Sequence, residues 1–316
     1  MEENNIKEKE NLEVEEEVAE DAKPYQVAIE DARHNLFTSY SKTRRISNII
    51  MFAVVIAIVG IMFLIIQNNN VLKIVGYSLA GALILGMILY YVLTRKKFPN
   101  KTKEYMEFVS NTLRNRMFKD DYSELSNDDA EKFELADFMS DGVYKEATGI
   151  NSRNIVRGVY KKHHFTYGEV ALLRPSTRKQ PVPPLFVGRY ISLPNDLKFD
   201  GRLLIVYKND KNPYDLPNDI DDLKVLEEKD DVVIYGVEGT DYKKIIGTEF
   251  LSKLRKVKLE KHLLNINIVF WGGHTAAYLS YDDTIMSFPF DKPFDYDGFE
   301  QSYNDFDAVI ALIAGE

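Results

Sequence analysis

The runs IIMFAVVIAIVGIMFLII (residues 49–66) and VLKIVGYSLAGALILGMILYYVL (residues 71–93) are separated by only four polar residues. The first run contains no charge and would span roughly 27 Å as an α-helix. The second contains one charge, Lys73, close to the polar turn, where its amine can reach lipid headgroups. Because the hydrocarbon core of a bilayer is about 30 Å thick, this spacing predicts a transmembrane helical hairpin.

Two other interpretations of these runs are weaker. Helices buried in a soluble protein usually keep a polar stripe, and neither run has one. A cleavable signal peptide occupies roughly the first 15 to 30 residues. The first run begins only at residue 49, and a second run follows it directly. We therefore expect membrane-spanning helices at 49–66 and 71–93.

Small residues recur along both runs. In the second run they are spaced every fourth residue, which places them on one helix face. Small side chains allow two membrane helices to approach closely. We therefore predict close packing within the hairpin along Ala53, Ala57, Gly60, Ser78, Ala82 and Gly86.

Basic residues flank the hairpin on the side away from its turn. Membrane proteins keep such residues in the cytoplasm, which predicts a multi-pass protein of the plasma membrane with both termini cytoplasmic. Beside the bilayer they would also contact anionic headgroups, each contributing about 1 kcal/mol. These flanking residues are Lys42, Arg44 and Arg45 before the first run and Arg95, Lys96 and Lys97 after the second.

The net charge of −9 is unevenly distributed over the 316 residues. Residues 1–24 carry −7 and few apolar side chains, which predicts an acidic disordered tail. Residues 25–103 carry +8 and include a juxtamembrane segment at 25–48, where a short helix is expected. Residues 104–316 carry −10. An acidic domain argues against nucleic acid as a partner, because phosphate binding needs clustered Lys and Arg.

Several chemistries are excluded by what the sequence lacks. It has no cysteine, and therefore no disulfide, thiolate metal site or cysteine nucleophile. It also has no P-loop, dinucleotide-binding glycine pattern, zinc motif or hydrolase elbow, and no cofactor is expected. The acidic segments 208–222 and 295–298 lack the spacing of a calcium-binding loop.

The spacing of apolar residues after the hairpin predicts a cytosolic α+β domain at 98–316, with a mainly antiparallel sheet and flanking helices. Two strands are expected to form a hairpin across a four-residue turn at 161–164, and another pair to meet at the two-residue turn Gly272-Gly273. Strands are predicted at 155–160, 165–173, 185–193, 203–207, 232–237, 265–271 and 274–281. Helices are predicted at 102–117 after a break at Pro99, at 128–140 behind Ser126, Asn127 and Asp128 as cap candidates, at 241–258, and at 299–314 behind Asp297.

A few polar residues could support chemistry. His163 and His164 could bind a metal ion, although adjacent side chains diverge and no third ligand is placed beside them. His274 beside the Gly272-Gly273 turn could act as a base, and a hydrolase could use Glu169 or Glu249 with His163, His164 or His274. The loop 174–184, which is rich in proline and basic residues, could close a small-molecule pocket.

Three further segments resemble a bacterial membrane family, the domain of unknown function 3137. They are FMSDGVYKEATGINSRNIVRGVYKKHHFTYGEVALL (138–173), PPLFVGRYISLPNDLKFDGRLLIVY (183–207) and INIVFWGGHTAAYLSY (266–281). Where the family has an apolar FxGLF-type phrase, this chain has LFVGRYISL (185–193). The resemblance implies two spans and a cytosolic α+β domain, assigns no catalytic residue, and points to a LemA-like membrane protein as a partner.

These observations support three functional hypotheses. The first is a membrane-anchored binding or scaffold module that recruits a protein or senses a ligand. The second is a hydrolase-like enzyme at the membrane surface. The third is a subunit of an oligomeric channel or transporter, which is weakened because neither span has an ionisable group at its centre. Association of identical chains is compatible with all three.

Overall fold

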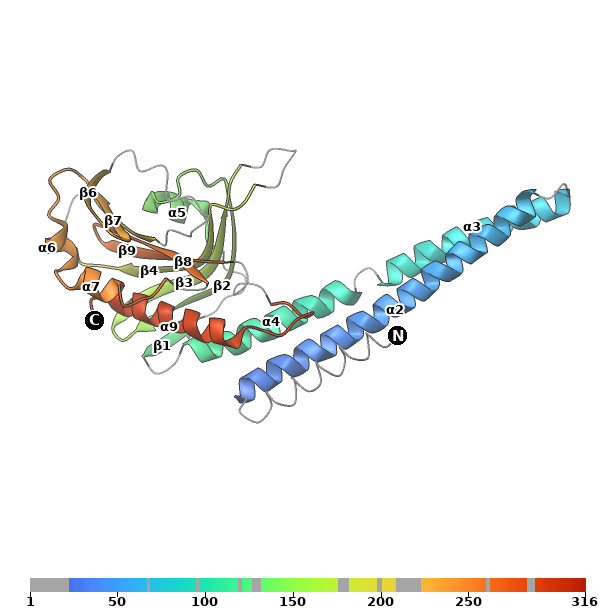
Figure 1. The fold of residues 1–316 in the computed structure, drawn as a ribbon, viewed down its shortest axis with the longest axis horizontal. Coiled ribbons are helices and arrows are strands. Elements are labelled where there is room, and N and C mark those ends of the chain that lie inside the picture. Colours follow the sequence, from blue (N-terminus) through green and yellow to red (C-terminus); the bar gives the residue numbers. More distant parts are fainter. Residues whose placement is uncertain are drawn as a thin grey trace. The chain divides into compact units, whose positions relative to one another are not determined.

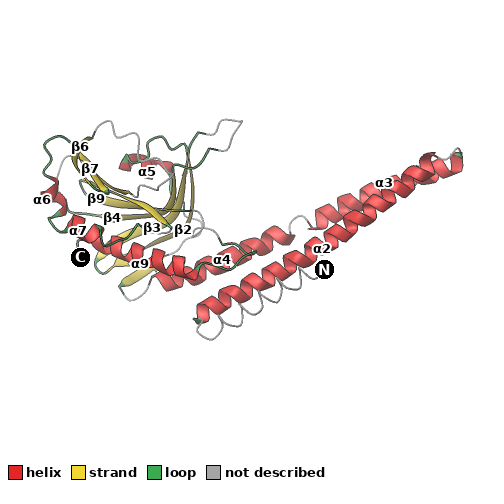
Figure 2. Cartoon of the chain, in the orientation of Figure 1, coloured by secondary structure: helices red, strands yellow, loops and turns green. Residues whose placement is uncertain are grey.

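The computed structural model describes residues 23–66, 69–94, 97–118, 121–126, 132–175, 182–197, 201–208, 223–259, 262–282 and 288–316. Within these ranges the chain has seven helices and nine strands, which confirms the predicted α+β class (Figures 1 and 2). It divides into two compact units. Unit 1 comprises Met1–Leu113 and Pro289–Phe294, and unit 2 comprises Arg114–Phe288 and Asp295–Glu316.

The helices are α2 (Pro24–Ile66), α3 (Asn70–Thr94), α4 (Lys97–Met117), α5 (Leu135–Asp141), α6 (Tyr242–Ile246), α7 (Phe250–Leu254) and α9 (Tyr296–Ile313). The strands are β1 (Tyr122–Ser126), β2 (Gly149–Tyr160), β3 (His163–Leu173), β4 (Phe186–Pro194), β5 (Arg202–Lys208), β6 (Lys224–Lys229), β7 (Val232–Gly236), β8 (Leu263–Trp271) and β9 (His274–Tyr281). The predictions for most of the tail 1–24, for the flanking residues Arg95 and Lys96, for the cap candidates Asn127 and Asp128, and for most of the loops 174–184 and 208–222 fall outside the described residues.

Unit 1 is built on α2, a single helix of 43 residues. At 1.5 Å per residue it is roughly 65 Å long. The segment expected to hold a short juxtamembrane helix is therefore continuous with the first apolar run. Helix α4 begins at Lys97, so the predicted break at Pro99 is wrong. Pro99 lies in the first helical turn, where a missing N–H leaves no intrahelical bond unmade.

Helices α2 and α3 pack on a different face from the one predicted. Their partly shielded side chains include Val54, Ala57, Ile61 and Leu64 on α2 and Leu72, Ala80 and Leu83 on α3. The close approach is at Gly76, where an added Cβ would lie 2.8 Å from Ile65 Cγ1. An added Cβ at Gly60 or Gly86 would meet no heavy atom within 4 Å. The predicted small-residue stripe is wrong except at Ala57, because Ala53, Gly60, Ser78, Ala82 and Gly86 are exposed.

The segment Pro289–Phe294, here called the strap, belongs to unit 1 although it lies between β9 and α9 in the sequence. The ring of Phe290 packs edge-on against Tyr40 of α2, with centroids 5.4 Å apart. The buried Phe294 donates its backbone N–H to Glu30 of α2 over 3.3 Å. The hydroxyl of Tyr105 on α4 donates to the first carbonyl of the strap over 3.3 Å. The strap is thus held by two helices of unit 1.

Unit 2 is organised around one antiparallel sheet in the order β1-β2-β3-β4-β9-β8-β5-β7-β6. Alternate residues of each strand face opposite sides. Phe165 and Tyr167 of β3 join the core under α9, and Val170 and Leu172 join the core under α5. Figure 1 shows α9 and α5 on opposite faces of this sheet. The sheet therefore separates two apolar cores.

Local structure in unit 2 corrects several predictions. The turn between β2 and β3 has two residues rather than four, because Lys161 adopts a left-handed conformation with φ of 53°. Helix α5 starts later than predicted, behind Glu134, which forms a reciprocal cap with Asp137. The predicted helix 241–258 is two short helices, interrupted at Gly247 with φ of 78°.

Other predictions for unit 2 are confirmed or refined. The β8–β9 hairpin turns at Gly272-Gly273 as expected. Strands β1 and β6, at the two sheet edges, were not predicted, because their polar sequences YSELS and KVLEEK carry little apolar alternation. The N-cap of α9 is Asp295 instead of Asp297, and its side chain accepts the N–H of Gly298 over 2.9 Å.

Candidate functional site

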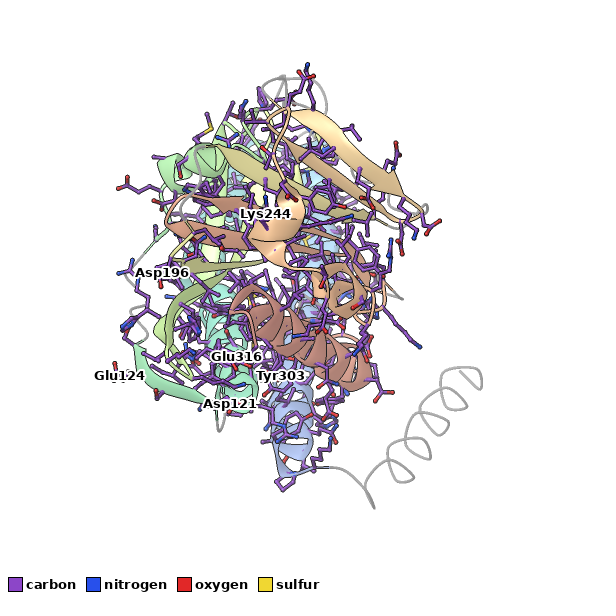
Figure 3. The ribbon with its side chains drawn as sticks, turned by 90° about the vertical axis from the view of Figure 1, so that its left-hand side faces the viewer. Asp121, Glu124, Asp196, Lys244, Tyr303 and Glu316 are labelled. Atoms are coloured by element: carbon purple, nitrogen blue, oxygen red, sulfur yellow. The ribbon has the colours of Figure 1, made fainter. Side chains whose placement is uncertain are left out.

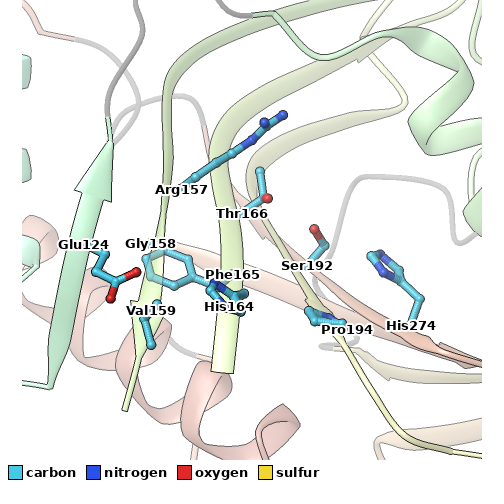
Figure 4. A pocket seen from close by; sticks show the side chains of 10 residues that line it. All are labelled: Glu124, Arg157, Gly158, Val159, His164, Phe165, Thr166, Ser192, Pro194 and His274. Atoms are coloured by element: carbon cyan, nitrogen blue, oxygen red, sulfur yellow. The ribbon is translucent and has the colours of Figure 1, made fainter. Parts of the chain in front are cut away.

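A groove of about 270 Å³ lies on the α5 side of the sheet, near one end of β2, β3 and β4. Figure 4 shows the side chains that line it. They come from five neighbouring strands, β1, β2, β3, β4 and β9. Its polar side chains are those of Glu124, Arg157, His164, Thr166, Ser192 and His274.

Strand register arranges part of this lining as a row. Arg157 pairs with Thr166, and Thr166 pairs with Ser192. His274 begins β9 and pairs with Pro194, two residues beyond Ser192 on β4. With strands about 4.8 Å apart, four strands spread this row over roughly 14 Å. In Figure 4 all four polar side chains of the row point to the same side of the sheet. The row therefore presents a guanidinium, two hydroxyls and an imidazole to one ligand.

His274 is fixed by its own hairpin. Its ring packs on that of Trp271, with centroids 4.4 Å apart. The amide of Asn195 donates to Thr275 Oγ1 over 2.7 Å and to the Trp271 carbonyl over 3.3 Å, which fixes the turn. Partial burial lowers the pKa of His274 below its ordinary value of 6.5. The imidazole is therefore mainly neutral at pH 7 and offers one donor and one acceptor.

A buried carboxyl lies further along the same sheet face. Asp141, the last residue of α5, is 1% exposed and accepts hydrogen bonds from the hydroxyls of Tyr190 over 3.1 Å and Tyr278 over 2.5 Å. Burial raises the pKa of Asp141 from 3.8 to about 7, although both tyrosines and the nearby Arg202 act to lower it. Tyr190 also contacts Ser192, so a chain of polar groups runs from the groove to this carboxyl.

Glu169 lies on the opposite, α9-facing side of the sheet. Its carboxylate accepts a hydrogen bond from Arg153 Nε over 2.6 Å. It also pairs across the strands with Arg189, which is 1% exposed, lies over the rings of Tyr281 and Phe299, and donates to the Ser302 carbonyl. Glu169 is thus a counter-ion for two arginines. The predicted combination of Glu169 with His274 is wrong.

The other predicted catalytic or metal-binding residues are also separated. His163 and His164 face opposite sides of β3, and only His164 lines the groove. His163 Nε2 lies 3.9 Å from Glu316 Oε1. Glu249 precedes α7, and its backbone carbonyl accepts the Ser252 hydroxyl. Over the ranges that the structure describes, no three His, Asp or Glu side chains form a metal site.

One histidine outside the groove joins two acids. His262 Nδ1 lies 2.8 Å from Asp282 Oδ2, and Nε2 lies 2.9 Å from Asp295 Oδ2. The two carboxylates flank the ring on opposite sides, so all three groups cannot bind one metal ion. Asp282 follows β9 and Asp295 caps α9. His262 therefore links the two points in unit 2 between which the chain forms the strap.

The fold and site define an α+β protein with an apolar helix pair and an open polar groove on its sheet. Comparison with protein-family models, with curated proteins and with solved structures gives no match to this chain. The resemblance to the domain of unknown function 3137 therefore stays a prediction.

Proposed function

We propose that this protein is a membrane-anchored binding module whose sheet domain works at the cytoplasmic face of the plasma membrane. The observation that carries the proposal is the exposure of the apolar helix pair. Helices α2 and α3 are each long and apolar enough to cross a membrane, and 0% and 6% of their most apolar windows are buried within the protein. Core helices of soluble proteins are mostly buried, so this exposed apolar surface supports a location in the membrane.

The exposed side chains are large. Phe52 is 70% exposed, Ile66 is 74% exposed and Leu85 is 69% exposed. Basic residues support the proposed orientation, since Lys42, Arg44 and Arg45 are exposed on α2 on the side away from the hairpin turn. Lys97 begins α4. The positive-inside rule then favours cytoplasmic termini, and these cations would meet anionic headgroups.

Helix α2 and the strap could couple ligand binding by unit 2 to the membrane-spanning helices. Helix α2 is continuous from its contacts with Phe290 and Phe294 of the strap to the end of the first apolar run. The strap connects through the chain to β9 and α9 of unit 2. We infer that the module recruits a protein or senses a ligand through unit 2.

An exchange experiment tests this function. The hairpin 49–93 is replaced by an unrelated two-span anchor, and proteins that co-purify from membranes are compared with those of the intact chain. A matched variant, Arg157→Gln, changes the groove and keeps the native hairpin. A binding module retains its partners after the hairpin exchange and loses them in the groove variant. Loss of all partners on hairpin exchange alone would contradict the proposal and favour the channel subunit.

A hydrolase is the second candidate, favoured by the presence of Ser192 and His274 in one groove. In serine hydrolases a carboxylate orients the histidine that activates the serine. Among the described residues no carboxylate contacts His274, whose ring packs on Trp271. Binding therefore ranks ahead of catalysis for this groove.

A further inference from the structure

The row on β2, β3, β4 and β9 is rich in hydrogen-bond donors. A guanidinium has five N–H donors and no acceptor, and it matches the geometry of a carboxylate or phosphate with two parallel bonds. Arg157 supplies this group, and the hydroxyls of Thr166 and Ser192 follow it on the next two strands. His274 closes the row on β9. Such a set matches the several acceptor oxygens of an oxyanion.

The charge distribution supports the same ligand class. Residues 104–316 carry a net charge of −10, yet among the described residues that line the groove the one acidic side chain is that of Glu124. Glu124 belongs to β1, which is separated from Thr166 by the whole of β2. Figure 4 shows it beside Val159, at the opposite side of the groove from His274. The donor row therefore places one cation, Arg157, and no acidic side chain on β2, β3, β4 and β9 among the described lining residues.

The groove is also small. Pockets for drug-sized ligands are typically about 300 to 1,000 Å³, and this one is about 270 Å³. A single phosphate or carboxylate group with a few attached carbons fits that volume. A longer ligand would have to extend out of the groove.

We propose that this groove binds a small phosphorylated or carboxylated molecule, whose oxyanion is held by Arg157 and Thr166 while Ser192 and His274 contact its other polar groups. The inference rests on the proposed function and names the ligand class of the module. Arg157 binds the anion in a two-point contact, and the hydroxyl of Thr166 on the next strand completes its coordination. His274 donates from one ring nitrogen.

Fluorescence of the intact protein in lipid nanodiscs tests the proposal. Trp271 is the only tryptophan of the chain and packs on His274, so its emission reports on the groove. Inorganic phosphate, glycerol 3-phosphate and succinate are titrated separately. We expect a saturable change with a phosphate probe or with succinate, and the preferred probe identifies phosphate or carboxylate as the ligand group.

Two variants assign the response to the donor row. Arg157→Gln is expected to weaken binding about tenfold or more, because hydrogen bonds to charged groups are the strong ones. Thr166→Val keeps the shape of the side chain and is expected to weaken binding about threefold to tenfold. Lys244→Gln is the control, since Lys244 is exposed on α6 outside the groove (Figure 3). Circular dichroism shows whether each variant is folded. If Arg157→Gln does not fold, the affinity of Thr166→Val tests the proposal instead.

Three results would overturn the inference: no saturable response in the wild type, equal affinity in the wild type and the folded groove variants, or an equal loss in Lys244→Gln. Retention of the same protein in carbonate-washed membranes is measured in parallel. A retained protein without a ligand response refutes the oxyanion site and leaves the membrane-anchored module standing. A protein lost from washed membranes refutes the anchor itself.

Discussion

Replacement of Asp141 by Asn should change how the stability of unit 2 depends on pH. Burial raises the pKa of Asp141 from 3.8 to about 7, so the folded state keeps a proton that the unfolded state has lost between these values. Stability from this proton is complete below pH 3.8 and is lost as pH rises toward 7. The difference between the two pKa values corresponds to about 4 kcal/mol, or about 1.4 kcal/mol per pH unit inside that range.

Urea unfolding of the intact protein in detergent micelles, followed by the emission of Trp271, measures this effect. The unfolding free energy of the wild type should fall relative to Asp141→Asn by about 2 kcal/mol between pH 5 and pH 6.5. Asp196→Asn, at an exposed position after β4 (Figure 3), should follow the wild type. Parallel curves for the wild type and Asp141→Asn would refute the reasoning, because the buried carboxyl would then not hold its proton.

Two further predictions concern glycines. A Leu64→Cys, Gly76→Cys double variant should form an internal disulfide, because an added Cβ at Gly76 lies 3.5 Å from Leu64 Cβ. Mass spectrometry detects the bond as a loss of about 2 Da. The control is Leu64→Cys, Gly86→Cys, and equal oxidation of the two double variants would contradict the packing of α3 on α2 at Gly76. Gly188→Ala should leave unit 2 unfolded, because its Cβ would lie 1.9 Å from the Leu279 carbonyl oxygen on β9. A variant with the wild-type Trp271 emission spectrum and the wild-type unfolding midpoint in urea would contradict this prediction.

The sequence predicts the helical hairpin because its two apolar runs carry a single charge, Lys73 beside the turn, over lengths that match a helix crossing. The strands β8 and β9 are similarly predictable, since alternation on both sides of Gly272-Gly273 leaves one pairing register. Helix boundaries were less predictable. Gly247 interrupts an apparently continuous helical pattern, because it adopts a positive φ that only the surrounding packing selects. The packing face of α3 depends on which glycine meets α2, and the small-residue spacing alone did not identify Gly76.

The groove could not be predicted, because it depends on strand order. The sequence separates His164 from His274 by more than a hundred residues, and only the pairing of β3 with β4 and of β4 with β9 brings them to one groove. Thr166 and Ser192 carry no motif that would indicate binding. Asp141 was missed for a similar reason, since a single acid at a helix end resembles a solvent-exposed residue until Tyr190 and Tyr278 are placed over it.

Labelling of introduced cysteines in intact cells tests the membrane anchor most directly. The chain has no native cysteine, so a membrane-impermeant maleimide reports only on the introduced thiol. Asn69 lies in the turn between α2 and α3, and Asp196 is exposed in unit 2. We predict that Asn69→Cys is labelled in intact cells and that Asp196→Cys is labelled only after lysis. Labelling of Asp196→Cys in intact cells, or protection of both cysteines until lysis, would contradict a hairpin that crosses the membrane with its sheet domain in the cytoplasm.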